Sequence, residues 1–171
     1  MFRYKCATCD LWHEGIPTFG AEAPFHYYEV PAEEREQRCS LGTDDCVIDE
    51  EFFFIRGCLD IPVIGAQQSF SWDIWVSQSK ENFVEFIRYF GKTERSHVGP
   101  FFGWLSAELP SSLYPSTLNL KARAHFRDNG LRPYIEVEPT DHPLAVEQRN
   151  GISVSRVAEI CAFYQHHLEP R

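Results

Sequence analysis

The sequence contains no apolar run long enough to cross a membrane. No stretch approaches the roughly 18 apolar residues that a spanning helix needs, and the opening Met-Phe-Arg-Tyr-Lys-Cys lacks the apolar stretch of a signal peptide. We therefore expect a cytoplasmic protein with no membrane partner. Because thiols stay reduced in that compartment, the six cysteines indicate metal or redox chemistry before structural disulfides.

Basic residues are few in relation to acidic ones. The chain has 16 Lys and Arg against 25 Asp and Glu, which gives a formal net charge of −9. A field of this sign repels phosphate backbones, so we expect no duplex nucleic acid as a partner. Residues 1–60 hold 5 of the basic and 13 of the acidic side chains. The remainder is therefore close to neutral, and Lys121, Arg123 and Arg127 could still hold a small anion.

The motifs of the main enzyme classes are also missing from the sequence. It has no GxSxG, no Walker-type glycine loop, no GxGxxG and no HExxH, and so gives no support to the enzymes that these motifs mark. Fixed-period repeats and low-complexity tracts are absent too. The length of 171 residues then predicts a single domain over 1–171, with a possible metal-binding lobe in 1–50 and a sheet with helices in 51–171.

Hydrophobic patterning predicts both strands and helices. Residues 51–63 are rich in Phe, Ile and Val, and residues 69–77 alternate, so both favour strands. Residues 31–38 favour a short charged helix, and residues 101–109 fit either a strand or a short helix. Ser79 is placed to cap a helix with one aromatic stripe, which we expect to lie in the core. That stripe consists of Phe83, Phe86, Ile87 and Phe90.

A β-hairpin is predicted around Asn129-Gly130, because Asn-Gly between alternating segments is a strong hairpin signal. A two-residue turn there sets Ala124 opposite Ile135 on the apolar face and Arg123 opposite Glu136 on the polar face. Charged and aromatic groups on a rigid sheet can form a binding site. The alternative is that this face is only a solvated ladder of cross-strand charges, which would require the same residues. The polar face comprises Lys121, Arg123, His125, Tyr134, Glu136 and Glu138.

Two C-terminal helices follow the hairpin. Asp141-His142-Pro143 is expected to start a short helix that ends near Gly151. Asp141 and His142 also form a possible acid–base pair, although an Asp before a Pro-initiated helix is more often a cap. Ser153 is expected to cap the last helix, whose inward side chains would be Val154, Val157, Ile160, Cys161, Tyr164 and Leu168. The whole pattern predicts an α+β fold with an antiparallel sheet, flanking helices and a small loop-rich N-terminal lobe that resembles a zinc knuckle.

The most chemically suggestive segment carries Cys6, Cys9 and His13. Two thiolates two residues apart can hold one tetrahedral metal ion, and an imidazole four residues further on can add a third ligand. A redox dithiol is an alternative, although a thioredoxin-type pair should close a strand and open a helix. Two unliganded thiols in a loop are the remaining interpretation. Zinc is the metal that this segment favours.

A complete structural site needs a ligand from elsewhere in the chain, because one CxxC pair supplies only half of it. Cys46 is favoured, since Asp44-Asp45-Cys46 sits in an expected loop from which a thiolate could reach the ion. Cys39 is a second possibility. Cys58 lies inside an apolar strand and Cys161 on the inner face of a helix, where small buried hydrophobic residues are normal.

Short motifs are spread over nearly the whole chain: Cys6-x-x-Cys9 with His13, Asp45-Cys46-Val-Ile-Asp49, Phe53-Phe-Ile-Arg-Gly57, Ile61-Pro-Val63, Trp75-Val-Ser77, Asn82-Phe83, Phe102-Gly-Trp-Leu105, Leu118-Asn-Leu-Lys121 and Thr140-Asp-His-Pro-Leu-Ala-Val-Glu-Gln148. Together these motifs resemble the bacterial family called domain of unknown function 2199. The resemblance supports zinc, because that pattern includes the cysteines that match Cys6, Cys9 and Cys46. The family pattern has Gly directly after the second cysteine of the pair, where this chain has Asp10. Trp75 and His142 match further motif residues of the family, and these are the positions to probe for a ligand.

The leading hypothesis is a zinc-stabilised binding or interaction module. Its zinc would be structural, held by Cys6, Cys9, His13 and Cys46, and its partner would be an unknown protein or a small polar ligand. The candidate ligand-binding residues are Trp75, Lys121, Arg123, Glu136 and His142. The alternative is an enzyme that acts on a small polar substrate through Asp141 and His142, or through the face formed by Arg123, His125 and Glu136.

Overall fold

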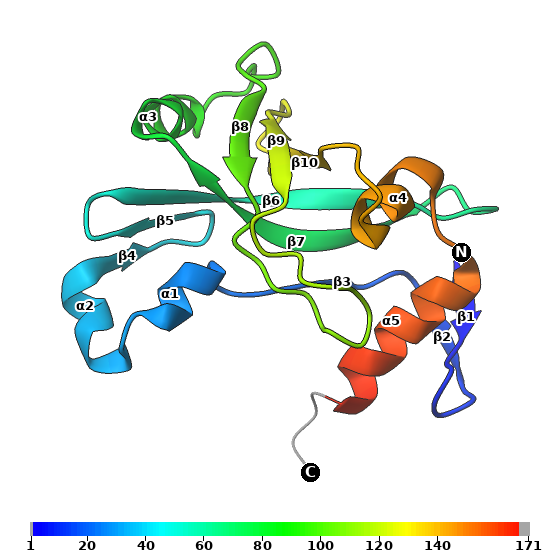
Figure 1. Cartoon of the computed structure of the whole chain (residues 1–171). Helices are drawn as coiled ribbons and strands as arrows, with labels where there is room; N and C mark the ends of the chain where they lie inside the picture. Colours follow the sequence, from blue (N-terminus) through cyan, green and yellow to red (C-terminus); the bar gives the residue numbers. More distant parts are fainter. Residues whose placement is uncertain (1, 168–171) are drawn as a thin grey trace.

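The computed structural model describes residues 2–167, which form strands and helices in irregular alternation along the chain (Figure 1). This arrangement confirms the predicted α+β class. The strands are β1 (Arg3–Lys5), β2 (Trp12–Glu14), β3 (Thr18–Gly20), β4 (Cys39–Leu41), β5 (Asp45–Ile48), β6 (Phe52–Pro62), β7 (Ser69–Gln78), β8 (Phe101–Trp104), β9 (Lys121–His125) and β10 (Tyr134–Val137). The helices are α1 (Phe25–Glu29), the 3₁₀ helix η1 (Ala32–Glu34), α2 (Arg35–Arg38), α3 (Lys80–Tyr89), α4 (Pro143–Asn150) and α5 (Val154–His167).

The long strands β6 and β7 form the centre of the fold. They pair antiparallel from Phe53 opposite Gln78 to Pro62 opposite Ser69, which confirms the two strands predicted in this region. The other edge of β6 is shared, because its first residues pair with β5 and Cys58 pairs with Tyr134 of β10. Strand β6 therefore joins the N-terminal strands to the C-terminal hairpin.

The main sheet is mixed, whereas the sequence predicted an antiparallel one. Strand β3 runs parallel to β7, and β10 runs parallel to β6. Both parallel pairs join segments that are distant in the sequence, and local alternation carries no information about such pairs. Strands β3, β4 and β5, which lie in the predicted N-terminal lobe, all belong to this sheet, whereas β1 and β2 form a separate two-stranded sheet.

The end of strand β8 returns to β7, so the sheet curls back on itself. Leu105 forms an isolated antiparallel bridge with Val76, and the Ser106 N–H donates to the Trp75 carbonyl at 2.8 Å. Gly103 allows this approach, because a Cβ atom there would lie 2.0 Å from the Ser77 carbonyl oxygen. Residues 101–104 are thus a strand, one of the two structures that the sequence allowed.

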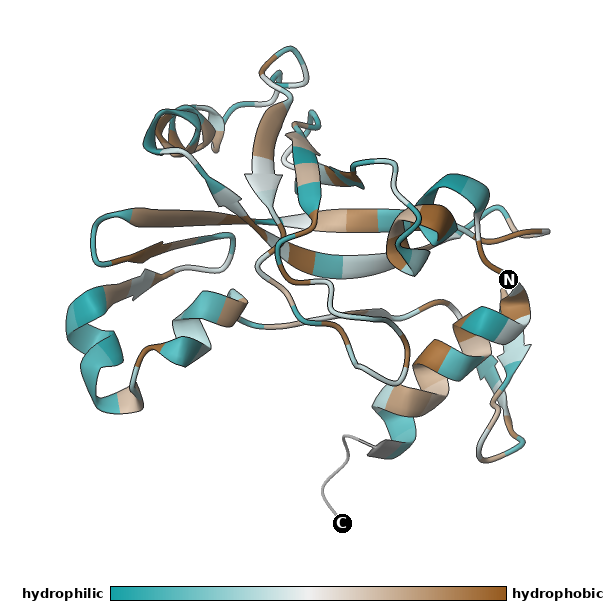
Figure 2. Cartoon of the chain, in the orientation of Figure 1, coloured by the Kyte–Doolittle hydropathy of each residue, from teal (hydrophilic) through white to brown (hydrophobic). Residues whose placement is uncertain are grey.

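Apolar side chains fill the curled sheet from inside. In Figure 2 brown residues gather along β5 and β6, whereas α2 is almost entirely teal. Trp72 of β7 and Ile135 of β10 are fully buried in the main core. A second, smaller cluster lies near the N-terminal end of β6. It consists of Val30, Cys46, Ile48, Phe54 and Trp75.

The predicted hairpin is confirmed in its register. Ala124 lies opposite Ile135 and Arg123 opposite Glu136. Asn129 and Gly130 have φ angles of 59° and 72°, and positive values at both central residues are what a type I′ turn requires. The charged pairs of the hairpin therefore lie on one face, as predicted.

Helix α3 begins after Ser79, whose side chain accepts from the Asn82 N–H as predicted. Its aromatic stripe is only half buried, which corrects the prediction that the whole stripe belongs to the core. Phe86 is 1% exposed, but Ile87 and Phe90 are each 47% exposed. Phe83 and Phe86 face the core, whereas Ile87 and Phe90 lie on the side of the stripe that is open to solvent.

The two C-terminal helices lie where the sequence placed them. Helix α4 ends at Gly151, and the Ser153 hydroxyl accepts from the Arg156 N–H at the start of α5. Val157 and Ile160 are fully buried, whereas Val154 is partly exposed and Leu168 lies outside the described residues. Helix α5 lies beside the β1–β2 hairpin (Figure 1), so the first and the last elements of the described chain are neighbours.

Candidate functional site

The β1–β2 hairpin positions the first cysteines. Tyr4 pairs with His13 across the two strands, and the Cys6 N–H donates to the Leu11 carbonyl at 2.8 Å. This bond closes a tight loop that carries the CxxC pair. Asp10 in the loop has a φ angle of 62°, a left-handed conformation that glycine adopts more readily. The tight turn after Cys9 therefore forms in this chain with Asp10 in place of the glycine of the family pattern.

Cys6, Cys9 and His13 form a group that could hold a metal ion. Their candidate ligand atoms all lie within 4.8 Å of one another, and the Cys9 Sγ is 3.7 Å from the His13 Nε2. The imidazole of His13 stacks on the ring of Tyr4, with centroids 5.4 Å apart, which fixes its orientation. The structure thus brings together three of the four predicted metal ligands.

A histidine from the other end of the chain also reaches this group. The Nε2 of His166, in helix α5, lies 3.2 Å from the Cys6 Sγ, and the neighbouring Gln165 side chain donates to the Tyr4 hydroxyl at 3.4 Å. Sequence reasoning missed His166, because 160 residues separate it from Cys6. Only the packing of α5 against the hairpin reveals it.

The surroundings of Cys6 favour its thiolate. Burial acts to raise its pKa, but hydrogen bonds from the backbone of Cys9 and Thr8, and from the side chains of His166 and Cys9, together lower the pKa to about 6. The Thr8 N–H lies 3.4 Å from the Cys6 Sγ. Such donors stabilise negative charge on sulfur, and the thiolate is the form of cysteine that binds metals.

Cys46 lies outside the metal group, contrary to the predicted ligand set. It is on β5, where it pairs with Phe54 of β6, and its side chain is fully buried in the second cluster beside Trp75. Burial chiefly, with the nearby Cys39 and Asp45 acting in the same direction, raises its pKa to about 12. The expected loop is a strand, so this thiol is a core side chain and cannot swing to the ion.

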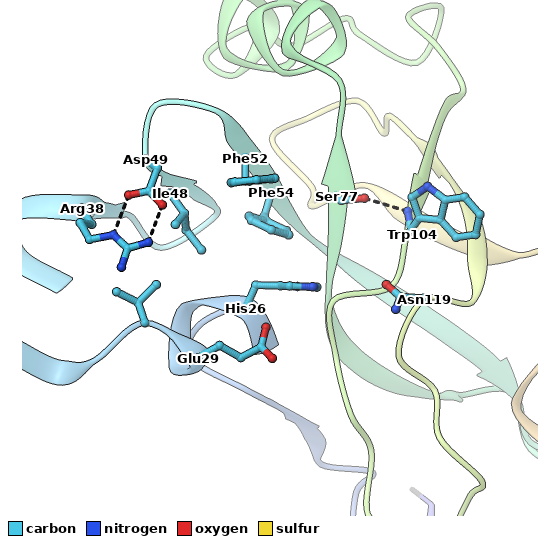
Figure 3. Close-up of a pocket in the computed structure, with 11 residues that line it drawn as sticks. His26, Glu29, Arg38, Ile48, Asp49, Phe52, Phe54, Ser77, Trp104 and Asn119 are labelled. Carbon is cyan, nitrogen blue, oxygen red and sulfur yellow. Dashed lines mark hydrogen bonds and ion pairs between the residues drawn. The ribbon is translucent and has the colours of Figure 1, made fainter. Parts of the chain in front are cut away.

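A cavity of about 360 Å³ opens in front of the second cluster. Figure 3 shows Phe52 and Phe54 above the ring of His26, with Glu29 below it and the Arg38–Asp49 ion pair at one side. The ring of His26 stacks on Phe54, with centroids 5.5 Å apart. Strands β5, β6 and β7 and helices α1 and α2 all contribute side chains, so the cavity exists only in the folded chain.

One polar group in this cavity is held in place from behind. The Nδ1 of His26 lies 2.6 Å from the hydroxyl of Ser106, which is only 1% exposed. Ser106 orients the ring and cannot itself meet a ligand. Ser77 accepts a hydrogen bond from the Trp104 N–H at 3.0 Å on the facing wall. Sequence analysis did not single out His26, because no motif marks it.

Among the predicted ligand-binding residues, Arg123 and Glu136 lie opposite each other on the β9–β10 hairpin, whereas Trp75 lies apart from them. Trp75 is fully buried behind the cavity, with its indole N–H donating to the Ala21 carbonyl. Lys121 and Arg123 are exposed on β9. Glu136 is occupied by His125 at 2.7 Å, and it borders a second, shallow cavity of about 300 Å³ with Arg123.

His142 has both ring nitrogens occupied by backbone groups. Its Nδ1 accepts from the Leu144 N–H at 3.2 Å, which makes it the cap of α4. Its Nε2 therefore carries the proton and donates to the Ser116 carbonyl at 3.1 Å. Neither nitrogen is free to act as a base, so the geometry gives no support to Asp141 and His142 as an acid–base pair.

The fold and the Cys/His group define a mixed α+β protein with a candidate metal centre where the β1–β2 hairpin meets helix α5. The chain belongs to a bacterial family, because the family model described as "Uncharacterized protein conserved in bacteria (DUF2199)" matches residues 5–152. This confirms the resemblance seen in the sequence. No curated protein and no solved structure matches the chain. Within residues 2–167 no helix is long and apolar enough to cross a membrane.

Proposed function

We propose that this protein is a zinc-stabilised binding module. Cys6, Cys9 and His13 hold a structural zinc ion, and the aromatic cavity around His26 binds a small ligand. The observation that carries the proposal is the cavity itself, because a concave, largely apolar space with a few fixed polar groups is the usual form of a small-molecule site. Its volume of about 360 Å³ is in the range of such sites.

Zinc is the metal that suits the ligand atoms. Thiolates are soft ligands that select zinc or copper(I) over magnesium and calcium, and imidazole also suits zinc. The hairpin loop holds Cys6 and Cys9 by backbone hydrogen bonds, so the pair is organised before the ion arrives. In a reducing compartment such a site stabilises a small loop-rich segment without a disulfide.

The cavity suits a ligand with a flat apolar body and one polar end. Phe52 and Phe54 offer aromatic surface, and Phe52 is 52% exposed at the rim, where a bound ring would cover it. The Nε2 of His26 and the amide of Asn119 give the polar end its hydrogen-bond partners (Figure 3). Arg38 is already neutralised by Asp49 at 2.6 Å, so the cavity does not favour a strongly charged anion.

Metal analysis of the purified protein tests the zinc half of the proposal. We expect about one equivalent of zinc per chain under reducing conditions, and its loss in the double variant Cys6→Ser with Cys9→Ser. Cys58→Ser is the matched control, because Cys58 lies on β6 near Asp73 and its loss should leave the zinc in place. Less than half an equivalent in the wild type, or retention in the double variant, would contradict the zinc site.

Binding of small aromatic probes tests the cavity. We expect indole and benzamide to give saturable NMR shifts at the Ile48 methyl group and the His26 ring. The variant Phe52→Ala should weaken binding by roughly fivefold, since one aromatic contact is worth about 1 kcal/mol. Phe102→Ala is the control, because Phe102 is similarly exposed at 43% but lies outside this cavity. Shifts spread evenly over the surface, or unchanged binding in Phe52→Ala, would rule out the cavity as the binding site.

A further inference from the structure

The spacing of the sulfur and nitrogen atoms at the chain ends matches a metal site with two cysteines and two histidines. In a tetrahedral zinc site, Zn–S is about 2.3 Å and Zn–N about 2.0–2.1 Å, so neighbouring S and N ligands lie about 3.5–3.6 Å apart. The two pairs in this structure lie on either side of that value. Cys9 and His13 are 3.7 Å apart, and Cys6 and His166 are 3.2 Å apart.

The hairpin by itself leaves the site incomplete. Cys6, Cys9 and His13 supply three ligands, and a structural zinc site needs four protein ligands. Cys46 cannot supply the fourth, because it is fully buried in the second cluster. Asp10, the nearest carboxylate in the loop, is paired with Lys5 at 2.7 Å. The missing ligand must therefore come from outside the hairpin.

His166 is close enough to Cys6, and mobile enough in its side chain, to complete the set of four metal ligands. It lies in the last described turn of α5 and is exposed, so its ring can rotate, whereas Gln165 and Tyr4 hold the helix beside the hairpin. Its Nε2 is close to Cys6 but outside the group whose atoms all lie within 4.8 Å. An ion at the three hairpin ligands would draw the imidazole inwards from the Cys6 side.

We propose that His166 is the fourth ligand and that the zinc ion fastens helix α5 to the β1–β2 hairpin. The inference rests on the zinc site of the proposed function and adds to it the residue that closes the coordination shell. A closed shell has no position for a substrate, so the ion is structural. Helix α5 starts after residue 152, where the family match ends, so the closing ligand comes from a segment outside that match.

Fastening α5 also protects the main core. Tyr164 stacks on Phe19 with ring centroids 4.2 Å apart and contacts Trp72 at 5.7 Å, while Ile160 and Cys161 of α5 are fully buried. Loss of the ion would leave the end of this cover attached by packing and by the hydrogen bond from Gln165 to Tyr4. The end of α5 that carries His166 is then expected to open first.

Cobalt substitution tests the fourth ligand directly, because Co²⁺ in a thiolate site gives visible bands that report ligand number and type. The wild type should show tetrahedral bands. His166→Ala should lower Co²⁺ and Zn²⁺ affinity by at least about tenfold, since even indirect changes around a metal ligand cost that much. His166→Cys should restore affinity and strengthen the sulfur-to-cobalt charge-transfer band. His125→Ala is the control, because His125 lies on the separate β9–β10 hairpin, where its ring contacts Glu136.

Hydrogen exchange of the wild-type protein gives a second measurement that needs no variant. Chelation of the metal should raise the exchange rate of amides in the last two turns of α5 by about tenfold or more, with little change in β6 and β7. Unchanged cobalt bands and affinity in His166→Ala would overturn the inference while leaving the zinc site intact. Equal exchange in α5 with and without metal would overturn it as well. A wild-type chain that binds no zinc would instead contradict the proposed function.

Discussion

The imidazole of His166 and the thiol of Cys6 lie 3.2 Å apart, although 160 residues separate them in the sequence. A shared metal ion at this point would therefore cross-link almost the whole chain. The entropy that a cross-link removes from the unfolded chain grows slowly with the length of the loop it closes. A link between these two segments would therefore remove more of this entropy than a link that closes a shorter loop.

The turn at Asp10 should tolerate glycine better than aspartate. Asp10 has a φ angle of 62°, where a side chain is strained, so Asp10→Gly is expected to raise the free energy of unfolding by roughly 0.5–1 kcal/mol. Asp10→Ala is the matched control, because it removes the same exposed ion pair with Lys5, which contributes little, but keeps a Cβ. Denaturant titration at saturating zinc measures both. An alanine variant as stable as the glycine variant would show that the backbone is not strained.

Removal of the Cys46 thiol should leave the metal in place. Cys46 is a core side chain beside Trp75, so Cys46→Ala should keep about one equivalent of zinc and lose about 1 kcal/mol of stability from reduced packing. The measurement is metal analysis after gel filtration, with Cys6→Ser as the comparison that loses zinc. Loss of zinc in Cys46→Ala while circular dichroism stays native would restore Cys46 as a ligand.

Alkaline pH should destabilise the protein through the same thiol. The pKa of Cys46 is raised from 9.0 to about 12, chiefly by burial. Below pH 9 the thiol is protonated in both states and its contribution is fully present. Between pH 9 and about 12 only the unfolded chain ionises, so stability falls by up to about 1.4 kcal/mol per pH unit for this group.

The denaturation midpoints of the wild type and of Cys46→Ala at pH 8 and pH 10 measure this effect, because their difference isolates one thiol. We expect the variant to lose less stability than the wild type over this interval. Equal losses would mean that Cys46 ionises in the folded protein at its ordinary pKa.

The two halves of the α3 stripe should respond differently to truncation. Phe86 is 1% exposed and Ile87 is 47% exposed, and both lie on the same helix. Phe86→Ala is expected to cost about 3–5 kcal/mol, whereas Ile87→Ala should stay within about 0.5 kcal/mol. Thermal or urea unfolding distinguishes the two. A cost above about 2 kcal/mol for Ile87→Ala would indicate that a partner covers this turn in solution.

The sequence predicted the elements whose signals are local. The Phe, Ile and Val content of residues 51–63 predicted β6, and alternation in residues 69–77 predicted β7. Asn129-Gly130 predicted the register of β9 and β10, and Ser79 predicted the start of α3. These signals work because side chains repeat every two residues in a strand and because caps and turns need particular residues at fixed offsets. The same reasoning failed for Ile87, since periodicity shows which side chains share a face but not how far the core extends beneath them.

By itself, the sequence determined the α+β class, the family and the three hairpin residues Cys6, Cys9 and His13, because the short spacing of those three keeps them close together in any fold of this segment. Only the tertiary structure decided where the remaining groups lie. It turned Cys46 into a core side chain, brought His166 to Cys6 and built the cavity around His26 from several strands and helices. These outcomes depend on how distant segments pack, including the two parallel strand pairs. The energy of such packing is shared among many contacts, so the spacing of residues within one motif does not predict it.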